Sequence, residues 1–335
     1  MADVAQTLGL SHQTVSRVLN GHPSVRPDTK ARVLKAVEEL GYRRNPAARA
    51  LVTRRSQTIG VFSFDTTLYG PASTLFGIEQ AAREAGYFVS VASLKTISLE
   101  NIREALDRFM SQGVDGIIII APLRTTVEAL SVVDSDLPVV VVEGWGTPGL
   151  ASVRVDQEGG ARLVTRHLLA QGATTVRHVA GPSNWIEAES RITGWRDELE
   201  RAKVAVPEVL RGDWSPLSGY DAGRVLAQSD ELDAVFVAND QMALGVLRAF
   251  HEAGIRVPED VLVAGFDDVP EAAFYSPPLT TVRQDFITVG QRCIDLLIRH
   301  ISDGRLTERQ SVVQAELMVR QSSLRKPPTS TRSVA

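Results

Sequence analysis

From residue 58 onward, short apolar runs alternate with amphipathic stretches, and this alternation constrains the fold more than any other feature of the chain. The first cycle has four runs, TIGVFSF, YFVSVAS, GVDGIIIIAP and LPVVVVE, with helices expected at Thr74–Ala85 and Ile102–Gln112. Apolar runs of this length between amphipathic helices predict a parallel sheet that helices cover on both faces. No window approaches the roughly 18 uninterrupted apolar residues that a membrane helix needs, so no membrane partner is expected.

A second cycle is expected to begin near Ser152 with SVRVD and to continue through TTVRHVAGP, DAVFVAND, VLVAGFDD and LTTVRQD. Two similar α/β lobes in series imply a cleft between them, and ligands of such sheets bind at the carboxyl ends of strands. Asn239, Asp267 and Gln284 follow three of these runs and are expected to meet at one rim. Asp240 is expected to cap the helix that continues as QMALGVLRAF.

Charge is distributed unevenly along the chain. Residues 1–55 contain 10 Lys and Arg against 4 Asp and Glu, a net charge of +6, whereas the whole 335-residue chain carries −4. A small basic segment on an acidic body is typical of a module that binds a polyanion such as DNA, because phosphate contacts need cations. Charge alone leaves a solvated basic tail as the other interpretation.

The sequence contains features that limit the class of protein. The single cysteine, Cys293, excludes an intramolecular disulfide framework, and the N-terminus lacks a basic segment followed by an apolar run, which together predict a cytoplasmic location. Walker A, HExxH and GxSxG motifs are absent, and the six histidines are scattered. We therefore expect no catalytic site, no metal site and no cofactor.

The segment ADVAQTLGLSHQTVSRVLN, residues 2–20, predicts a helix-turn-helix. Ala2–Leu8 is expected to form a short helix that Gly9 ends in the left-handed conformation, and Ser11 can cap a second helix. Val15, Val18 and Leu19 then face inward. The polar residues that face outward, where a recognition helix meets the major groove, are Gln13, Thr14, Ser16, Arg17 and Asn20.

A third helix is expected at about Asp28–Leu40, closing the bundle through Val33, Val37 and Leu40. This head resembles the DNA-binding domain of the lactose-repressor (LacI/GalR) family, down to QTVSRVLN and ELGYRRNPAARAL. In that family the residues at His12, Gln13 and Arg17 meet base edges. The family usually has several residues before the first helix, so the start at Met1 implies either a start codon assigned too late or a frayed first helix.

The stretch Asn45–Leu51 begins with an Asn-Pro step and continues with an Ala-rich run, which makes a helix too short to be stable alone. The resemblance implies a hinge helix that orders on DNA and pairs with its dimer mate in the minor groove, where Leu51 wedges a base step open. A plain interdomain linker is the alternative. The complete predicted DNA-binding set is His12, Gln13, Thr14, Ser16, Arg17, Asn20, Ala48 and Leu51.

The body resembles the effector-binding core of the same family, a two-lobed fold like that of periplasmic binding proteins. The match is strongest at GDWSPLSGY, VANDQMALG, GFDD and SPPLTTVRQDF. The effector contacts implied by this resemblance are Leu68, Gly70, Pro71, Thr74, Arg191, Trp214, Asn239, Asp267, Gln284 and Phe286. Such a set suits a sugar, because Arg191, Asn239 and Asp267 can bond vicinal hydroxyls while Trp214 and Phe286 offer flat faces to C–H surfaces.

Three positions depart from the pattern of the lactose-binding member of the family. Glu143 stands where that protein has Asp, Glu187 where it has Ser, and Phe64 where it has Ser. We include Glu143 and Glu187 in the effector-binding set. Two longer carboxylates and a bulkier wall predict a mono- or disaccharide ligand, or a glycosidic linkage, that differs from lactose derivatives.

Three other functions are compatible with parts of the sequence. GWGTPG, residues 144–149, matches the dinucleotide pattern GxGxxG, but the strand-like LASVRV follows it where a helix N-terminus would be needed. The body alone would also fit a free periplasmic solute-binding protein, which the basic head argues against. Within the family, a corepressor-dependent regulator of the purine-repressor type remains the alternative to a sugar-induced repressor, with Tyr69 as the aromatic residue such a site would use.

The predicted organisation has four parts. Residues 1–44 form an all-α helix-turn-helix domain, 45–56 the hinge and linker, 57–323 the α/β core with two parallel doubly wound sheets, and 324–335 a disordered tail rich in Pro, Ser and Thr. In the core, the first lobe spans about 57–155 and 286–313, and the second about 156–283 and 314–323. The chain ends without leucine heptads, so a homodimer that binds a palindromic operator is expected.

Overall fold

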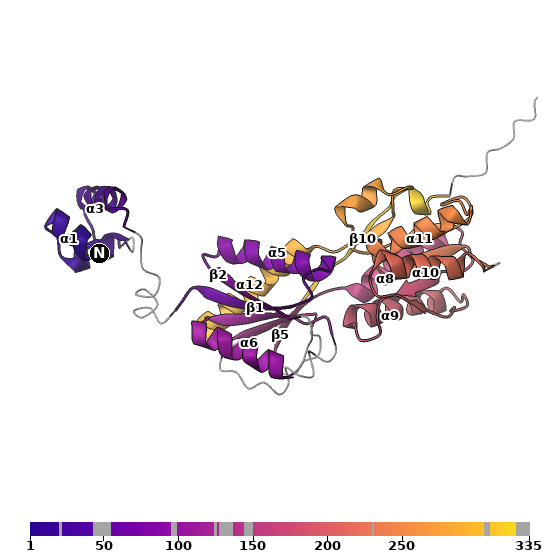
Figure 1. The fold of residues 1–335 in the computed structure, drawn as a ribbon, viewed down its shortest axis with the longest axis horizontal. Coiled ribbons are helices and arrows are strands. Elements are labelled where there is room, and N and C mark those ends of the chain that lie inside the picture. The colour runs from indigo at the N-terminus through magenta and orange to yellow at the C-terminus, as the bar shows by residue number, and fades with distance from the viewer. Residues whose placement is uncertain are drawn as a thin grey trace, which may run out of the picture. The chain divides into compact units, whose positions relative to one another are not determined.

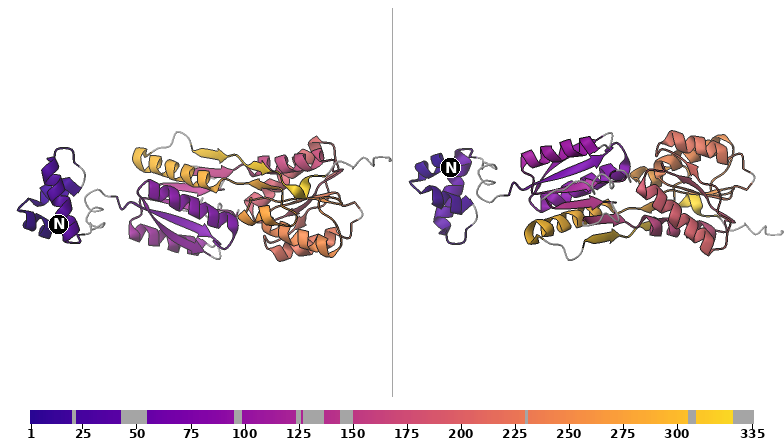
Figure 2. Two further views of the ribbon diagram at one scale, coloured as in Figure 1. Left: turned by 90° about the horizontal axis from the view of Figure 1, so that it is seen from above. Right: turned by 90° about the horizontal axis from the view of Figure 1, so that it is seen from below.

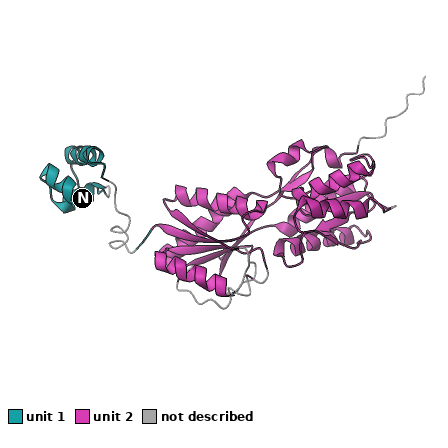
Figure 3. Ribbon diagram, in the orientation of Figure 1, with its two compact units in different colours: residues 1–56 teal, residues 57–335 magenta. Residues whose placement is uncertain are grey.

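The structure is a computed structural model, and it describes residues 1–19, 22–42, 55–94, 99–123, 126, 137–143, 150–229, 231–304 and 309–325. The chain divides into two compact units, Met1–Ser56 and Gln57–Ala335 (Figure 3). Ala48 and Leu51 of the predicted hinge helix, Asn20 and the GWGTPG segment lie outside the described residues. Within the described ranges, no helix is long and apolar enough to cross a membrane.

The described part of the first unit forms the helices α1 (Ala2–Leu8), α2 (His12–Leu19) and α3 (Pro27–Glu39) (Figure 1). Gly9 ends α1 at φ 63°, in the left-handed region that glycine enters without a Cβ clash. The amide of Thr14 donates to Ser11 Oγ at 3.1 Å. Both turn features expected from the sequence are therefore confirmed.

A small apolar core holds the three helices of this unit together. Val4, Ala5, Val15, Val18, Leu19, Val33 and Ala36 are its buried members. The expectation that Leu40 closes the bundle was wrong, because α3 ends at Glu39 and leaves the Leu40 side chain 47% exposed. Ala36, one turn earlier, takes the inward position instead.

The first lobe of the second unit is a six-stranded parallel sheet in the order β11-β5-β4-β3-β1-β2. Its strands are β1 (Thr58–Phe64), β2 (Phe88–Leu94), β3 (Gly116–Ile120), β4 (Val139–Val142), β5 (Ala151–Val155) and β11 (Gln310–Val313). Its described helices are α5 (Tyr69–Glu84), α6 (Leu99–Gln112) and α12 (Phe286–Asp303). The view from above in Figure 2 shows helices on both faces of this sheet.

Alternation along the strands explains the two covered faces. Ile118 and Ile120 of β3 pack with residues of α5 and α12 in one core cluster, whereas Ile117 and Ile119 pack with residues of α6 in another. The sequence placed SVRVD at the start of the second cycle, but β5 pairs with β4 and β11 inside the first sheet. The sheet of the second lobe begins with the next strand, β6.

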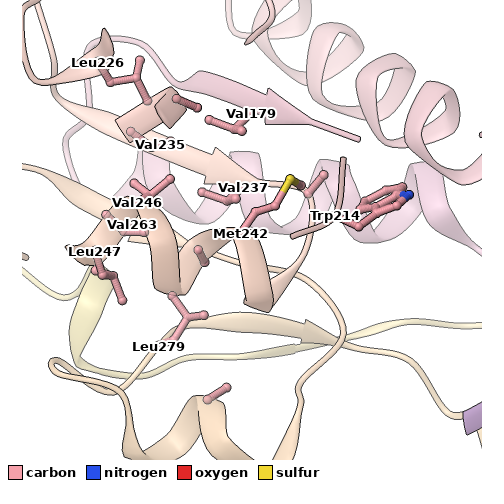
Figure 4. Packing of buried hydrophobic residues seen from close by; sticks show 14 of the residues in the cluster. Val179, Trp214, Leu226, Val235, Val237, Met242, Val246, Leu247, Val263 and Leu279 are labelled. Carbon is pink, nitrogen blue, oxygen red and sulfur yellow. The ribbon is translucent and has the colours of Figure 1, made fainter. Parts of the chain in front are cut away.

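The second lobe has a four-stranded parallel sheet in the order β7-β6-β8-β9. The strands are β6 (Arg177–Ala180), β7 (Leu210–Arg211), β8 (Ala234–Val237) and β9 (Leu262–Ala264). Its helices are α8 (Gln157–Ala170), α9 (Ile186–Arg201), α10 (Pro216–Leu226) and α11 (Asp240–Glu252), with short 3-10 turns at Pro270–Phe274 and Gln321–Ser323. Valines of β6, β8 and β9 pack against α10 and α11 in the cluster that Figure 4 draws.

The chain passes between the lobes three times. It leaves β5 for α8, leaves β10 (Thr281–Arg283) for α12, and leaves β11 for β12 (Glu316–Met318), while β10 and β12 pair antiparallel. Leu324 and Arg325, which the sequence assigned to a disordered tail, belong to the described residues. Arg325 donates to Gly172 O at 3.3 Å and pairs with Asp233. The rest of the predicted tail, residues 326–335, lies outside the described residues.

Helices α10 and α11 approach each other through glycines. A Cβ added to Gly245 would collide with the backbone oxygen of Pro216 and lie 2.5 Å from the backbone nitrogen of Tyr220. A Cβ added to Gly219 would collide with the backbone of Met242. Because backbone atoms cannot move aside as a flexible side chain can, this face of the second lobe tolerates no larger residue at either position.

We predict that Gly245→Ala destabilises the protein by about 3 kcal/mol, at the upper end of the overpacking range. Urea unfolding followed by the fluorescence of the buried tryptophans measures this loss. Gly70→Ala is the matched control, because Gly70 lies in α5 with no heavy atom within 4 Å of the added Cβ. It should leave the unfolding midpoint unchanged or raised, and equal midpoints for both variants would contradict the packing argument.

Candidate functional site

Helix α2 presents the predicted DNA-reading residues. Val15, Val18 and Leu19 are buried, so the opposite face of the helix is turned to solvent. Of the predicted residues on α2, His12, Gln13 and Arg17 are exposed, whereas Thr14 and Ser16 are half-buried. Thr14 is tied to the turn by a 2.9 Å bond between its Oγ1 and Ser11 Oγ. The unit therefore offers forked polar side chains on a short, firmly capped helix, the geometry that a major groove accepts.

A cavity of about 270 Å³ lies in the second unit. The first lobe contributes the loop and first turn of α5, and the second lobe contributes the carboxyl ends of its strands and the helices that follow them. The described lining residues are Thr67, Leu68, Tyr69, Gly70, Pro71, Trp185, Glu187, Arg191, Trp214, Ser215, Pro216, Asn239, Gln241, Asp267 and Gln284. Such a volume is close to the lower limit of about 300 Å³ for small-molecule sites.

Nine of the twelve predicted effector residues line this cavity: Leu68, Gly70, Pro71, Glu187, Arg191, Trp214, Asn239, Asp267 and Gln284. The other three are not among its lining residues. Thr74 is buried within α5, and Phe286 begins α12, where its ring meets Tyr69 edge-on at 5.9 Å. Glu143 follows β4 and is buried, with Oε1 accepting from the amide of Val155 at 3.0 Å.

Arg191 is the centre of the polar network beneath the cavity. Its side chain is 2% exposed; Nε donates to Gln157 Oε1 at 2.9 Å, and one terminal nitrogen donates to Ala238 O at 2.5 Å. The other terminal nitrogen of the guanidinium lies 3.8 Å from Asp267 Oδ1. Gln157 was missed in the sequence, although it follows β5 after one residue, Asp156, much as Gln284 directly follows β10.

Gln284 completes the network from the β10 crossover. Its Nε2 donates to Asp267 Oδ1 at 2.7 Å, and its Oε1 accepts from Gln157 Nε2 at 2.9 Å. Gln157 and Gln284 belong to two of the three segments that cross between the lobes. A ligand that bonds to this network therefore acts on the crossovers as well as on the second lobe.

Asn239 takes the capping role that the sequence suggested for Asp240, and it also lines the cavity. Asn239, not Asp240, caps α11, because its Oδ1 accepts from the amide of Met242 at 2.9 Å. Both Nδ2 hydrogens of Asn239 are used, by Trp214 O and Gln241 Oε1. Asp240 is fully buried and accepts from Val269 N at 2.9 Å and Thr281 Oγ1 at 2.6 Å, which ties the start of α11 to β10.

The cavity wall on the second lobe is aromatic. Trp214 is 7% exposed and adopts φ 74°, a left-handed conformation that turns the GDWS loop sharply. Its ring meets Trp185 edge-on at 5.4 Å, and the Arg191 guanidinium lies 5.7 Å from the ring centroid. Trp185 was not recognised in the sequence, because nothing in GPSNW distinguishes a cavity-lining tryptophan from a core one.

Burial dominates the electrostatics of the acidic residues around the cavity. Burial raises the pKa of Asp267 to about 6, with Arg191 and the bond from Gln284 opposing the rise. Burial also raises the pKa of Glu187, and the negative charge of Glu143 raises it further. The pKa of Glu143 is raised by burial against the bond from Val155 and the charge of Arg191. Burial therefore disfavours the ionised form of all three carboxyls.

Comparisons with known proteins agree with this architecture. Residues 1–45 match the family model of bacterial regulatory proteins of the lacI family, and residues 165–323 match that of a periplasmic binding protein-like domain. The lactose operon repressor of Escherichia coli (strain K12) is 34% identical over 333 residues, covering 99% of this chain and 92% of that protein. A PurR transcriptional repressor of Haemophilus influenzae is 32% identical over 96% of this chain and 97% of its own length.

Two solved structures are similar over both units. The lac repressor dimer bound to operator and the anti-inducer ONPF has a TM-score of 0.87 at 33% identity, covering 96% of this chain and 98% of that one. The complex of the transcriptional regulator CelR with cellobiose has a TM-score of 0.73 at 30% identity, covering 95% and 98%. The chain therefore belongs to the lacI family of bacterial regulatory proteins, and it is a DNA-binding transcriptional regulator rather than an enzyme.

Proposed function

We propose that this regulator represses transcription from a near-palindromic operator and is released when a small sugar or glycoside binds in the cavity. The observation that carries the proposal is the cavity itself, where tryptophan rings stand beside the network of Arg191, Asp267 and Gln284. Flat rings suit the C–H faces of a sugar, and fixed polar groups suit its hydroxyls. Because operator DNA lies in the bacterial cytoplasm, the proposal includes a cytoplasmic location.

The active form is a homodimer, which two half-sites of an operator require. Each lobe of the second unit exposes large apolar side chains that a monomer would leave in water. Phe76 and Phe88 are 54% and 72% exposed in the first lobe, and Leu217 and Phe274 are 69% and 87% exposed in the second. The dimeric lac repressor structure supports the same assembly.

The segments that cross between the lobes explain how a bound sugar would release the protein from its operator. A sugar that bonds to Asp267 and Gln284 favours one arrangement of the lobes, and the change in the first lobe reaches the hinges that precede β1. Because binding free energies are linked, operator must weaken sugar affinity by the factor by which sugar weakens operator affinity. Operator duplexes selected from randomised DNA, titrated with and without the best sugar of a thermal-shift screen, measure both factors.

The alternative is a ligand that tightens operator binding, as in corepressor-dependent regulators. Tyr69 lines the cavity from the first lobe, so an aromatic residue of the kind that a planar base would use is present. The same titration separates the two functions by sign. A purine that strengthens operator binding, with sugars inert, would overturn the sugar-induced repressor.

We predict that Arg17→Ala relaxes operator preference at one base pair, at a cost of about 1–3 kcal/mol, because Arg17 is exposed on α2 with the fork that guanine accepts. Competition among single-base operator variants measures it. Lys35→Ala is the control, since Lys35 pairs with Glu39 on the surface of α3 and should change only the salt dependence. If Arg17→Ala weakened binding to every operator variant by the same factor, Arg17 would be a phosphate contact and the assignment would be wrong.

We predict that Asp267→Asn lowers sugar affinity at least about tenfold and leaves operator affinity unchanged, giving a repressor that sugar cannot release. Asn keeps an acceptor for Gln284, and Gln157 and Ala238 O still bond to Arg191, so the fold should survive the loss of the ion pair. Calorimetry with sugar and anisotropy with operator measure the two affinities. Unaltered release by sugar would exclude Asp267 from the effector site.

A further inference from the structure

Glu187 differs from the other charged groups of the cavity because no described cation forms an ion pair with it. It is the second residue of α9 and lines the cavity. Two residues further along the same turn, Glu189 pairs with Arg211 at 2.8 Å. Glu187 has neither a hydrogen bond nor an ion pair with any described residue. Both acids suit a helix N-terminus, so the helix alone does not explain why Glu187 is turned to the cavity.

The charges that face Glu187 do not balance. Glu143 after β4 and Asp267 after β9 both raise the pKa of Glu187, and Arg191 is the described cation that lowers it. Arg191 already has Asp267 as its ion-pair partner, while Arg154 of β5 acts on Glu143. Among the described residues, the cavity therefore carries more carboxyl groups than cations.

A second, independent observation is that another polar group of the same cavity has no hydrogen-bond partner among the described residues. The indole Nε1–H of Trp214 is buried and has no hydrogen-bond partner among the described residues. Figure 4 shows the indole nitrogen turned away from the other labelled side chains of the core cluster. A buried donor without an acceptor costs about 1–3 kcal/mol. A ligand with an oxygen for Trp214 and a cation for Glu187 would remove both deficits.

We propose that the effector carries a protonated amine that Glu187 binds, so that the ligand is an amino sugar or an amino-substituted glycoside. The inference rests on the proposed sugar-binding function and narrows its ligand class. A neutral sugar offers Glu187 only hydroxyl groups and supplies no opposite charge. An ammonium group at bonding distance stabilises the carboxylate instead.

The two ligand classes differ in the number of protons that binding exchanges. Burial raises the pKa of Glu187 to about 8, so most of the free protein holds a proton there at pH 6.5. An ammonium ligand lowers that pKa, and binding releases protons. A neutral sugar brings no opposite charge, so its binding exchanges few protons at Glu187. At pH 6.5 an amine with a pKa of about 8 is itself charged and contributes little.

The test compares matched ligand pairs by calorimetry on the full chain at pH 6.5. D-glucosamine, D-galactosamine and the β-1,4-linked glucosamine disaccharide are each paired with the neutral parent, D-glucose, D-galactose or cellobiose. N-acetyl derivatives control for the size of the substituent. Each titration is repeated in two buffers of different ionisation enthalpy, which gives the number of protons exchanged. The variants are Glu187→Gln and, as control, Glu189→Gln.

We expect at least one amino sugar to bind about 10- to 100-fold more tightly than its neutral parent, with proton release. Glu187→Gln should remove that preference, and Glu189→Gln should keep it. A neutral parent that binds as tightly as its amine, or an amine that binds without proton release, would overturn the inference and leave the sugar-induced repressor standing. Binding by none of the sugars, charged or neutral, would overturn the proposed function and this inference together.

Discussion

Burial of the Arg191 guanidinium is the constraint on which the site depends. A buried charge costs several kcal/mol unless partners surround it, and Arg191 finds them in Gln157, Ala238 O and Asp267. Its flat face also lies 3.9 Å from the ring centroid of Phe266. These partners come from the start of α8, the end of β8 and the loop after β9. One cation thus holds together the carboxyl-end loops of the second lobe.

The same network links the lobes because two of its members lie on crossovers. Gln157 follows β5 of the first sheet, and Gln284 lies between β10 and α12. A rotation of one lobe against the other must shift at least one of these glutamines relative to Arg191. The hydrogen bonds of the network are directional, so it favours discrete lobe arrangements over a continuum. A ligand needs only to bond differently to Asp267 and Gln284 in two arrangements to select between them.

The sequence predicted the strands best where burial on both faces produces an unbroken apolar run, as in Thr58–Phe64, which is β1 to the residue. It missed β11, because QSVV is a partly exposed edge strand with a weak pattern, and β7, which has two residues. Nine of the twelve predicted effector residues line the cavity. Glu143 and Phe286 are not among the lining residues. A sequence can locate the end of a strand, but it does not show in which direction a side chain near that end points.

The internal bonds also decide which groups remain for a ligand. The side-chain amide of Asn239 is hydrogen-bonded to Met242 N, Trp214 O and Gln241 Oε1. It therefore positions the tryptophan loop, and both of its N–H donors are occupied before a sugar hydroxyl arrives. Asp267 is held by Gln284, and burial resists its ionisation. Among the described lining residues, the Trp214 indole N–H has no hydrogen-bond partner, and the Glu187 carboxyl has neither a hydrogen bond nor an ion pair. Of these two groups, Glu187 alone can distinguish ligands by charge, so it is the described group best placed to discriminate charged from neutral sugars.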